Sequence, residues 1–325
     1  MSAAPAHPFP VSDHCDGRRF FNPRRQDYRG WGAVLKWRMT SRATPWPQRV
    51  ELAPPPPLPP APTGDGVAAT WIGHATFLLQ TRHGALLTDP VYSERAGPFG
   101  LAGPRRVHAP GVDFAALPRI AYVLLSHDHY DHCDLATLRR LARAHNPLLI
   151  APLGHATLAR RAGLRVVELD WWQTHELAPG MSVTATPARH WSNRIRGARN
   201  SRLWCGFAVR AGGRVVQFVG DTGYDDTMFR EIRARLGPPD LALVPIGAYE
   251  PRWFMSAYHC NPAEAVQIHR ELGARQSVAM HWGTWQLTDE GREEPPRALA
   301  EARVAAGLPA EAFRVLAPGE SVAVL

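Results

Sequence analysis

The sequence predicts an α/β fold in which two β-sheets pack face to face with helices outside them. Short runs rich in β-branched and apolar residues dominate the chain from Val67 onward. Helical patterns lie between some of these runs and separate them into two clusters. Two clusters of strands that bury their apolar faces against each other account for this order. No short-period repeat is present, and 325 residues are enough for one α/β domain with a sizeable core.

The first 62 residues are predicted to form an N-terminal arm and a proline-rich linker. Residues 1–52 are basic and aromatic, as in GRRFFNPRRQDYRGW, and residues 53–62 read APPPPLPPAP. Such a run of prolines favours polyproline II, which acts as a stiff spacer. We therefore expect an arm and linker at 1–62 that drape over a folded domain at 63–325.

The later elements follow from local pattern. Pro262 and the pair Pro295–Pro296 begin two helical patterns, where the first turn of a helix tolerates proline. Helices are predicted at 135–145, 225–236, 262–272 and 295–307. Strands are predicted at 67–72, 76–81, 85–88, 120–126, 147–151, 166–169, 181–186, 203–209, 214–220, 241–246, 276–281, 313–317 and 321–325.

Composition and charge limit the classes of protein. Hydrophobic residues make up 45% of the chain and charged residues 20%, values typical of a globular protein. There are 37 Lys and Arg against 29 Asp and Glu, which gives a net charge of +8 and a pI near 9.8. This balance favours anionic partners, such as phosphate esters, anionic lipid surfaces or nucleic acid.

Cysteine usage and the N-terminus bear on the compartment. The four cysteines are scattered, with no CxxC pair and no spacing typical of a disulfide framework, so a reducing compartment is the simpler reading. The start of the sequence has no basic n-region followed by an apolar h-region. No stretch approaches the roughly 18 uninterrupted apolar residues of a membrane span. We expect a cytoplasmic protein that can contact the inner membrane peripherally.

A loop rich in histidine and aspartate follows one predicted strand. Residues 126–134 read SHDHYDHCD and come after the apolar run IAYVLL. The loop after a buried strand is where α/β sheets concentrate ligands. His127, His129, Asp131 and His132 can surround a divalent ion. A histidine-rich set favours zinc, with iron and manganese as alternatives, and a solvated polar loop is the reading without a metal.

Three more candidate ligands end later apolar runs. They are His190 in TATPARHW, Asp221 in VVQFVGDTGY and His281 in SVAMHWGTW. A single histidine after a strand is more often a hydrogen-bonded core or rim residue. Because all three should project from the same edge as the loop, together they predict a metal-binding constellation.

The motif HDHYDH followed by single His, Asp and His residues resembles the metallo-β-lactamase superfamily. The stretches TWIGHATFLL, LTDPVYSERAGP, GPRR, VPIGAYEPRWFM, NPAEAVQIH and HWGTW, with ELDWW, PARHW and GDTGYDD, are similar to the N-acylphosphatidylethanolamine-hydrolysing phospholipase D family. The resemblance runs from about Asp13 to beyond Glu294. It implies a metallo-β-lactamase αββα four-layer sandwich, with two mixed sheets flanked by helices, and makes 63–325 the catalytic domain.

The resemblance also implies a site and its partners. Two zinc ions are expected, with a phospholipid substrate, a homodimer and a lipid entrance that faces the membrane. The implied ligands are His127, His129 and His190 for one zinc, Asp131, His132 and His281 for the other, and Asp221 as the bridge.

Such a centre suits hydrolysis of a phosphodiester. A metal pair supplies hydroxide at neutral pH, polarises a phosphoryl oxygen and stabilises the leaving alkoxide. We predict a phospholipase D-type phosphodiesterase that cleaves N-acylphosphatidylethanolamine, or a related phospholipid, to phosphatidic acid and N-acylethanolamine. Asp131 and Asp221 are its predicted catalytic carboxylates. His259 in AYHCN is a further catalytic candidate near the phosphate, with a structural histidine as the alternative.

Other functions stay open on sequence alone. A nuclease would use the positive charge, but the basic residues look dispersed and no RNP or KH motif is present, so no nucleic-acid partner is expected. A phosphosugar lactonase shares the GHAT-type start and the metal ligands. A metal-binding or membrane-docking scaffold has no use for an open dimetal site.

Residues around the motifs carry secondary predictions. Asp89 either hydrogen-bonds a ligand histidine or closes the turn before Pro90. His74 is expected to be a buried, hydrogen-bonded neighbour of the site and not a ligand. Cys133 stands where the family has an apolar residue, so we expect sensitivity to oxidation.

Three further features of the sequence carry expectations. The basic segment RIRGARNSRLW after His190 does not align with the family, which leaves the wall of the cleft unassigned. Core packing is the default for the Trp171–Trp172 pair and the PRWF aromatics. The candidates for membrane contact lie in the N-terminal arm and are Arg18, Arg19, Phe20, Phe21, Arg24 and Arg25.

Overall fold

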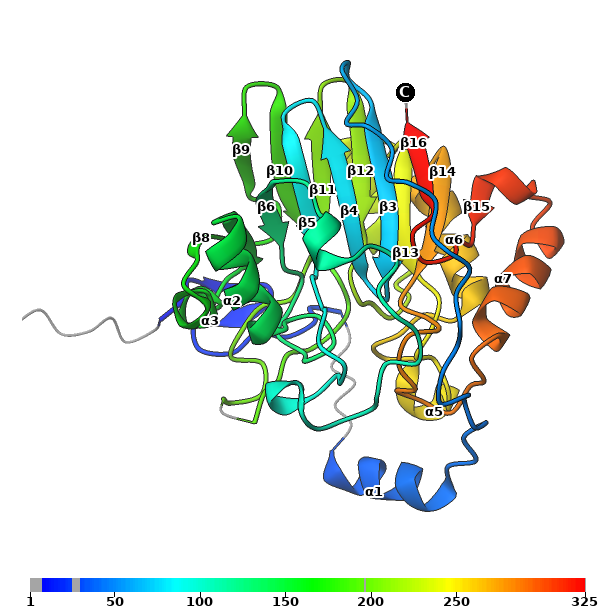
Figure 1. Ribbon diagram of the computed structural model, residues 1–325. Coiled ribbons are helices and arrows are strands. Elements are labelled where there is room, and N and C mark those ends of the chain that lie inside the picture. Colours follow the sequence, from blue (N-terminus) through cyan, green and yellow to red (C-terminus); the bar gives the residue numbers. More distant parts are fainter. Residues whose placement is uncertain (1–7, 25–29, 196, 325) are drawn as a thin grey trace, which may run out of the picture.

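The computed structural model describes residues 8–24, 30–195 and 197–324. Within them, two seven-stranded β-sheets pack face to face, and helices cover the outer faces (Figure 1). The predicted fold class, a four-layer sandwich of two mixed sheets flanked by helices, is therefore confirmed. In the described ranges, no helix combines the length and the apolar character that a membrane crossing requires.

The first sheet contains strands from both ends of the folded domain. Its strands in spatial order are β16 (Ser321–Val324), β3 (Val67–Gly73), β4 (Thr76–Thr81), β5 (Gly84–Thr88), β6 (Ile120–Leu124), β7 (Leu148–Pro152) and β8 (Arg165–Leu169). The pairs from β16 to β5 are antiparallel and those from β5 to β8 are parallel. Parallel neighbours need a crossover, and α2 (Leu135–Ala144) and α3 (Ala156–Ala162) supply two of them.

The second sheet has the same mixed character. Its strands in spatial order are β15 (Phe313–Arg314), β14 (Gln276–Met280), β13 (Leu241–Pro245), β12 (Arg214–Phe218), β11 (Gly206–Ala211), β10 (Met181–Thr186) and β9 (Thr174–Ala178). The pairs from β9 to β12 are antiparallel, and those from β12 to β15 are parallel. The crossovers contain α4 (Met228–Leu236), α5 (Arg252–Met255), α6 (Pro262–Leu272) and α7 (Glu294–Ala305).

Alternation along the strands divides the apolar side chains between two cores. On β4, Phe77 and Leu79 enter the core between the sheets, while Leu78 points to the core under α2 and α3. Successive side chains of a β-strand point to opposite faces of the sheet, so a strand between two cores contributes side chains to both. All three side chains are fully buried. Trp71 and Phe218 extend the inter-sheet core.

The N-terminal region packs against the domain more closely than an arm that drapes over it. It contains a hairpin, β1 (Val11–Ser12) and β2 (Cys15–Asp16), and a helix, α1 (Trp31–Thr40). Phe20 is buried in the inter-sheet core cluster, so this part of the predicted membrane contact is wrong. Arg24 lies 3.4 Å from the Asp225 carboxylate, and Arg25 falls outside the described residues. The division at residue 62 stays a prediction. Three short 3-10 helices complete the fold: η1 (Pro98–Gly100), η2 (Phe114–Ala116) and η3 (Ala310–Ala312).

Candidate metal centre

The histidine-rich loop leaves the carboxyl end of β6, as the sequence predicts. Asp89 follows β5, the parallel neighbour of β6, so its carboxylate reaches the same edge of the sheet. Asp89 Oδ1 accepts the N–H of Ser126 at 2.7 Å, and Asp89 Oδ2 accepts from Ser126 Oγ at 2.5 Å. Asp89 Oδ2 also lies 2.6 Å from His132 Nδ1. Of the two readings of Asp89, the structure shows the hydrogen bond to a candidate ligand.

Three predicted ligands form the first group of donors. His127 Nε2 lies 2.9 Å from His129 Nδ1, and His190 Nε2 lies 3.2 Å from the same atom. His190 comes from the segment after β10, 61 residues from His129 along the chain. The strand ends bring the three rings together, and they form one of the groups able to hold a metal ion.

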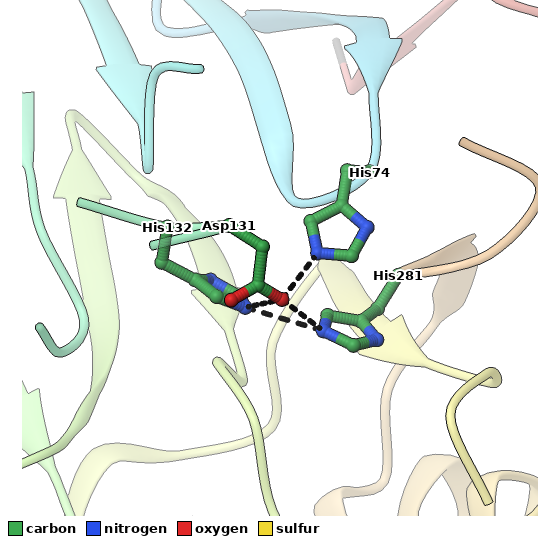
Figure 2. A group of neighbouring side chains, drawn as sticks. All are labelled: His74, Asp131, His132 and His281. Atoms are coloured by element: carbon green, nitrogen blue, oxygen red, sulfur yellow. Dashed lines mark hydrogen bonds and ion pairs between the residues drawn. The ribbon is translucent and has the colours of Figure 1, made fainter. Parts of the chain in front are cut away.

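Four side chains form the second group (Figure 2). His132 Nε2 and His281 Nε2 are 3.2 Å apart. They lie 3.4 and 3.5 Å from Asp131 Oδ2. His74 joins them, with Nε2 at 3.0 Å from the same oxygen. His74 is buried and hydrogen-bonded, as the sequence predicts, and the expectation that it is not a ligand stays a prediction.

Asp221 lies between the two groups. Its Oδ2 is 3.2 Å from His132 Nε2 and 3.1 Å from His281 Nε2 in the second group. The same atom is 3.7 Å from His190 Nε2 and 4.0 Å from His127 Nε2 in the first. Asp221 Oδ2 is therefore within 4.0 Å of imidazole nitrogens from both groups, and its role as a bridge stays a prediction.

The donor set fits divalent metal ions. Zinc–nitrogen bonds of about 2.0–2.1 Å in a tetrahedron imply nitrogen–nitrogen separations of roughly 3.3 Å, close to the spacing of these imidazoles. Protein acceptors meet the outer nitrogens of two of these rings: the backbone oxygen of Tyr258 lies 3.0 Å from His190 Nδ1, and Asp89 lies against His132 Nδ1. In a neutral ring, such a contact holds the proton on the outer nitrogen and leaves the inner nitrogen free for a metal ion. Burial lowers the pKa of His132, but Asp221 and Asp131 outweigh it and hold the pKa well above its ordinary value, so a metal ion bound at this ring would displace a proton. Asp221 Oδ1 and His129 Nε2 are buried without a hydrogen-bond partner among the described residues.

The charges of the two carboxylates suit the same role. Burial raises the pKa of Asp221, but His132 and His281 outweigh it and hold the pKa well below its ordinary value. Burial also raises the pKa of Asp131, but His132 outweighs it and holds the pKa well below its ordinary value. Both groups are therefore ionised at neutral pH. Burial lowers the pKa of His127 and His190 well below normal, which keeps these rings neutral and able to bind a cation.

His259 faces the centre from a different element. Its Nδ1 lies 4.0 Å from Asp221 Oδ2 and has no hydrogen-bond partner among the described residues. Its ring centroid is 5.1 Å from that of His190. Burial, the largest influence, lowers the pKa of His259 to about 4, so the ring is neutral at pH 7. A neutral imidazole at the rim of the centre can donate or accept one hydrogen bond.

The predicted sensitivity of Cys133 to oxidation has no support in the structure. The side chain is fully buried. Burial also raises the pKa of its thiol to about 12, so the reactive thiolate does not form at neutral pH.

The segment after His190, which the sequence left unassigned, forms a wall beside the metal loop. Asp128 is fully buried and binds this segment, accepting from the Asn193 N–H at 2.9 Å and from Arg202 Nη1 at 2.9 Å. Trp191 packs edge to face on His129, with ring centroids 4.4 Å apart. In the sequence, the one signal for this contact was Asp128, the acidic residue inside the histidine motif.

The tryptophan pair and the PRWF aromatics divide between core and surface. Trp171 is buried in the core, as the default predicted. Phe254 stacks on Trp37, whereas Trp253 keeps 39% of its surface exposed.

Known proteins are similar to this chain in sequence and in fold. A family model described as a β-lactamase superfamily domain matches residues 85–282. The N-acyl-phosphatidylethanolamine-hydrolyzing phospholipase D 1 of Caenorhabditis elegans is 41% identical over 248 residues, which cover 73% of this chain and 69% of that protein. The mitochondrial enzyme of the same name from Saccharomyces cerevisiae is 35% identical over 71% of this chain and half of its own length.

Other relatives extend the comparison. A metal-dependent hydrolase of Opitutus terrae is 32% identical over 78% of this chain and 99% of that protein. The solved structure of Igni18, a metallo hydrolase from the archaeon Ignicoccus hospitalis, superimposes with a TM-score of 0.60 at 20% identity, covering 80% of this chain and 99% of that one. At this identity the likeness concerns the fold alone. The fold, the histidine and aspartate cluster and these relatives agree: the chain is a metal-dependent hydrolase of the metallo-β-lactamase superfamily, and belongs to its N-acylphosphatidylethanolamine-hydrolysing phospholipase D-like family.

Proposed function

We propose that the protein is a dizinc phospholipase D-type phosphodiesterase that hydrolyses N-acylphosphatidylethanolamine or a closely related phospholipid. The observation that carries the proposal is the pair of ligand groups on either side of Asp221. The identity to the nematode phospholipase supports the choice of substrate. The products are phosphatidic acid and N-acylethanolamine.

The ligand assignment is part of the proposal. His127, His129 and His190 would hold one ion, and Asp131, His132 and His281 the other, with Asp221 shared. When bound, a zinc pair lowers the pKa of water to about 7 and polarises a phosphoryl oxygen. Iron or manganese would serve the same donor set.

The protein's own groups would orient the reactants. Because Asp131 is ionised and can only accept, His74 donates its Nε2–H to Asp131 Oδ2. Burial, the largest influence, lowers the pKa of His74 to about 3 and keeps its ring neutral. This bond fixes Asp131, whose carboxylate can accept a hydrogen bond from the attacking water. The water oxygen forms the new bond to phosphorus, the bond to the ethanolamine oxygen breaks, and one proton passes from the water to that oxygen. His259, neutral and at the rim, would donate a hydrogen bond to a phosphoryl oxygen.

Two variants test the proposal on mixed micelles that contain N-acylphosphatidylethanolamine. Asp131→Asn removes the orienting carboxylate, and Asp113→Asn changes an exposed aspartate as the matched control. We expect phosphatidic acid from the wild-type protein and the control, and loss of turnover in Asp131→Asn. Near-wild-type turnover of Asp131→Asn with normal metal content would contradict the assignment. If zinc-loaded protein yields no product, phosphosugar lactones are the next substrates to test.

The partners and compartment belong to the same proposal. We propose a cytoplasmic homodimer that meets its substrate at the inner membrane. Sedimentation velocity across a range of protein concentrations tests the dimer, and fractionation of cells tests the compartment.

A further inference from the structure

A strongly basic face lies on the helices that cover the first sheet. The stretch 135–167 carries six arginines and no Asp or Glu, within a chain whose whole net charge is +8. The expectation that the basic residues are dispersed is therefore wrong for this region. α2 and α3 lie side by side (Figure 1). Their leucines point into the core, so five arginines of the helices face solvent: Arg139, Arg140, Arg143, Arg160 and Arg161. Arg165, the first residue of β8, is exposed as well.

These arginines differ from those on the opposite face of the molecule. Within the described ranges, no carboxylate lies within ion-pair distance of any of the six. On the other sheet, α4 contains the pair Arg235–Glu231 at 2.8 Å, and Arg252 contacts Glu264 at 2.8 Å. Arginines without anionic partners on one face create a positive potential that extends into solvent.

An apolar groove continues this basic face toward the metal loop. The groove has a volume of about 360 Å³ and lies between α2, α3, η1 and the segment after His190. Leu135 and Leu158 line it together with arginines from four segments: Arg95, Arg139, Arg161 and Arg194. Tyr130 and Cys133 of the metal loop also line it.

Exposed apolar side chains stand beside these arginines. Phe99 is 86% exposed and Ile195 73% exposed, and both line the groove. Leu101, next to η1, is 81% exposed. Large apolar residues held in water next to cations are typical of surfaces that enter the headgroup region of a bilayer.

We propose that this face, formed by α2, α3, η1 and Ile195, docks on an anionic phospholipid bilayer. The arginines bind lipid phosphates, while Phe99, Leu101 and Ile195 enter the interface. The choice of a lipid surface rests on the proposed function. Nucleic acid would also attract the arginines, but binding to a phosphate backbone gives no role to exposed Leu101 and Ile195. Because Tyr130 and Cys133 of the metal loop line the same groove, docking would bring this loop close to the bilayer surface.

The test is co-sedimentation of zinc-loaded, full-length protein with vesicles. Vesicles of phosphatidylcholine alone are compared with vesicles that also contain phosphatidylglycerol, at low and high salt. The patch variant replaces arginines on α2 and α3: Arg139→Gln, Arg143→Gln, Arg160→Gln and Arg161→Gln. The control replaces exposed arginines over the other sheet with the same change of charge: Arg233→Gln, Arg270→Gln, Arg275→Gln and Arg297→Gln.

Each arginine at an anionic surface contributes roughly fivefold in partitioning, so the patch variant should bind about two to three orders of magnitude more weakly. The control should bind like the wild type. Phe99→Ser with Ile195→Ser should weaken the binding that persists at high salt, where charge is screened. Equal binding of patch variant and wild type, or no preference for anionic vesicles, would overturn the inference. So would retention of duplex DNA in place of vesicles.

Turnover of a water-soluble phosphodiester, bis(p-nitrophenyl) phosphate, is measured in parallel without vesicles. The patch variant should keep wild-type turnover there, because its four substitutions lie outside the metal centre. Vesicle binding with no hydrolysis of any phosphodiester supports the docking face and refutes the proposed function. Hydrolysis of N-acylphosphatidylethanolamine that does not require the arginines supports the proposed function and refutes the docking face.

Discussion

Replacing Asp89 by asparagine tests how the metal centre is held in place. The Asp89 carboxylate is fully buried and accepts three hydrogen bonds, from Ser126 N, Ser126 Oγ and His132 Nδ1. Asparagine can keep an oxygen toward the Ser126 N–H. Its amide N–H₂ would then meet His132 Nδ1–H, so a donor would face a donor.

The magnitude follows from the bond that is lost. A hydrogen bond between a charged acceptor and its donor contributes about 1.5–3 kcal/mol, and loss of such a partner lowers metal affinity by roughly 10–100-fold. Under the proposed assignment, only the ion that His132, Asp131 and His281 would hold should be affected. The change in shape is small, so the protein should stay folded.

The assay is a zinc competition titration against a chromophoric chelator, which resolves the two binding steps. Asp113→Asn is the matched control, because it makes the same chemical change at an exposed site. We expect one weakened step in Asp89→Asn and two wild-type steps in the control. Two unchanged steps in folded Asp89→Asn protein would refute the claim that Asp89 orients His132.

Four other predictions concern the metals, the rim histidine, a buried ion pair and the N-terminal hairpin. Removing metal with a chelator should abolish turnover and added zinc should restore it; full activity of metal-free protein would contradict the proposed chemistry. His259→Ala should lower turnover while both metals stay bound, and unchanged turnover would make it a structural residue. Arg202→Met leaves the Asp128 carboxylate buried without its partner, so the free energy of unfolding in urea should fall by about 3–5 kcal/mol. The double variant Arg202→Met with Asp128→Asn should lose less stability, and equal losses in the two variants would argue against the ion pair. Burial lowers the pKa of His14, but hydrogen bonds to Asp170 and Asp13 outweigh it and raise the pKa. The stability that this raised pKa contributes is therefore fully present below the unfolded pKa of about 6.5, and it is lost as pH rises through the folded pKa. Over that range of pH, the difference in unfolding free energy between wild type and His14→Gln should decrease. A constant difference in unfolding free energy would count against it.

The strands and candidate ligands could be read from sequence because local pattern encodes both. The helix predicted at 262–272 is α6, and Asn261 and Glu264 close its first turn with reciprocal hydrogen bonds. Ligands that follow apolar runs lie at strand ends, and a sheet brings strand ends together without further information. That is why His127, His190 and Asp221 meet as expected.

What the sequence did not reveal depends on contacts between distant segments. The partner of Asp128 is Arg202, 74 residues away, and no local pattern links the two. Phe20 looks like a surface aromatic among arginines, yet its ring is buried because it packs into the inter-sheet core cluster. The arginines of α2 and α3 form one face only because the two helices pack side by side.

The central claim is that this metal centre hydrolyses a phosphodiester on the head-group side of phosphorus. The most direct measurement is mass spectrometry of the products formed from N-acylphosphatidylethanolamine in ¹⁸O-labelled water by zinc-loaded protein. The account predicts phosphatidic acid that carries ¹⁸O on phosphorus, together with unlabelled N-acylethanolamine. Label in the N-acylethanolamine, or no product from protein with both zinc ions bound, would contradict it.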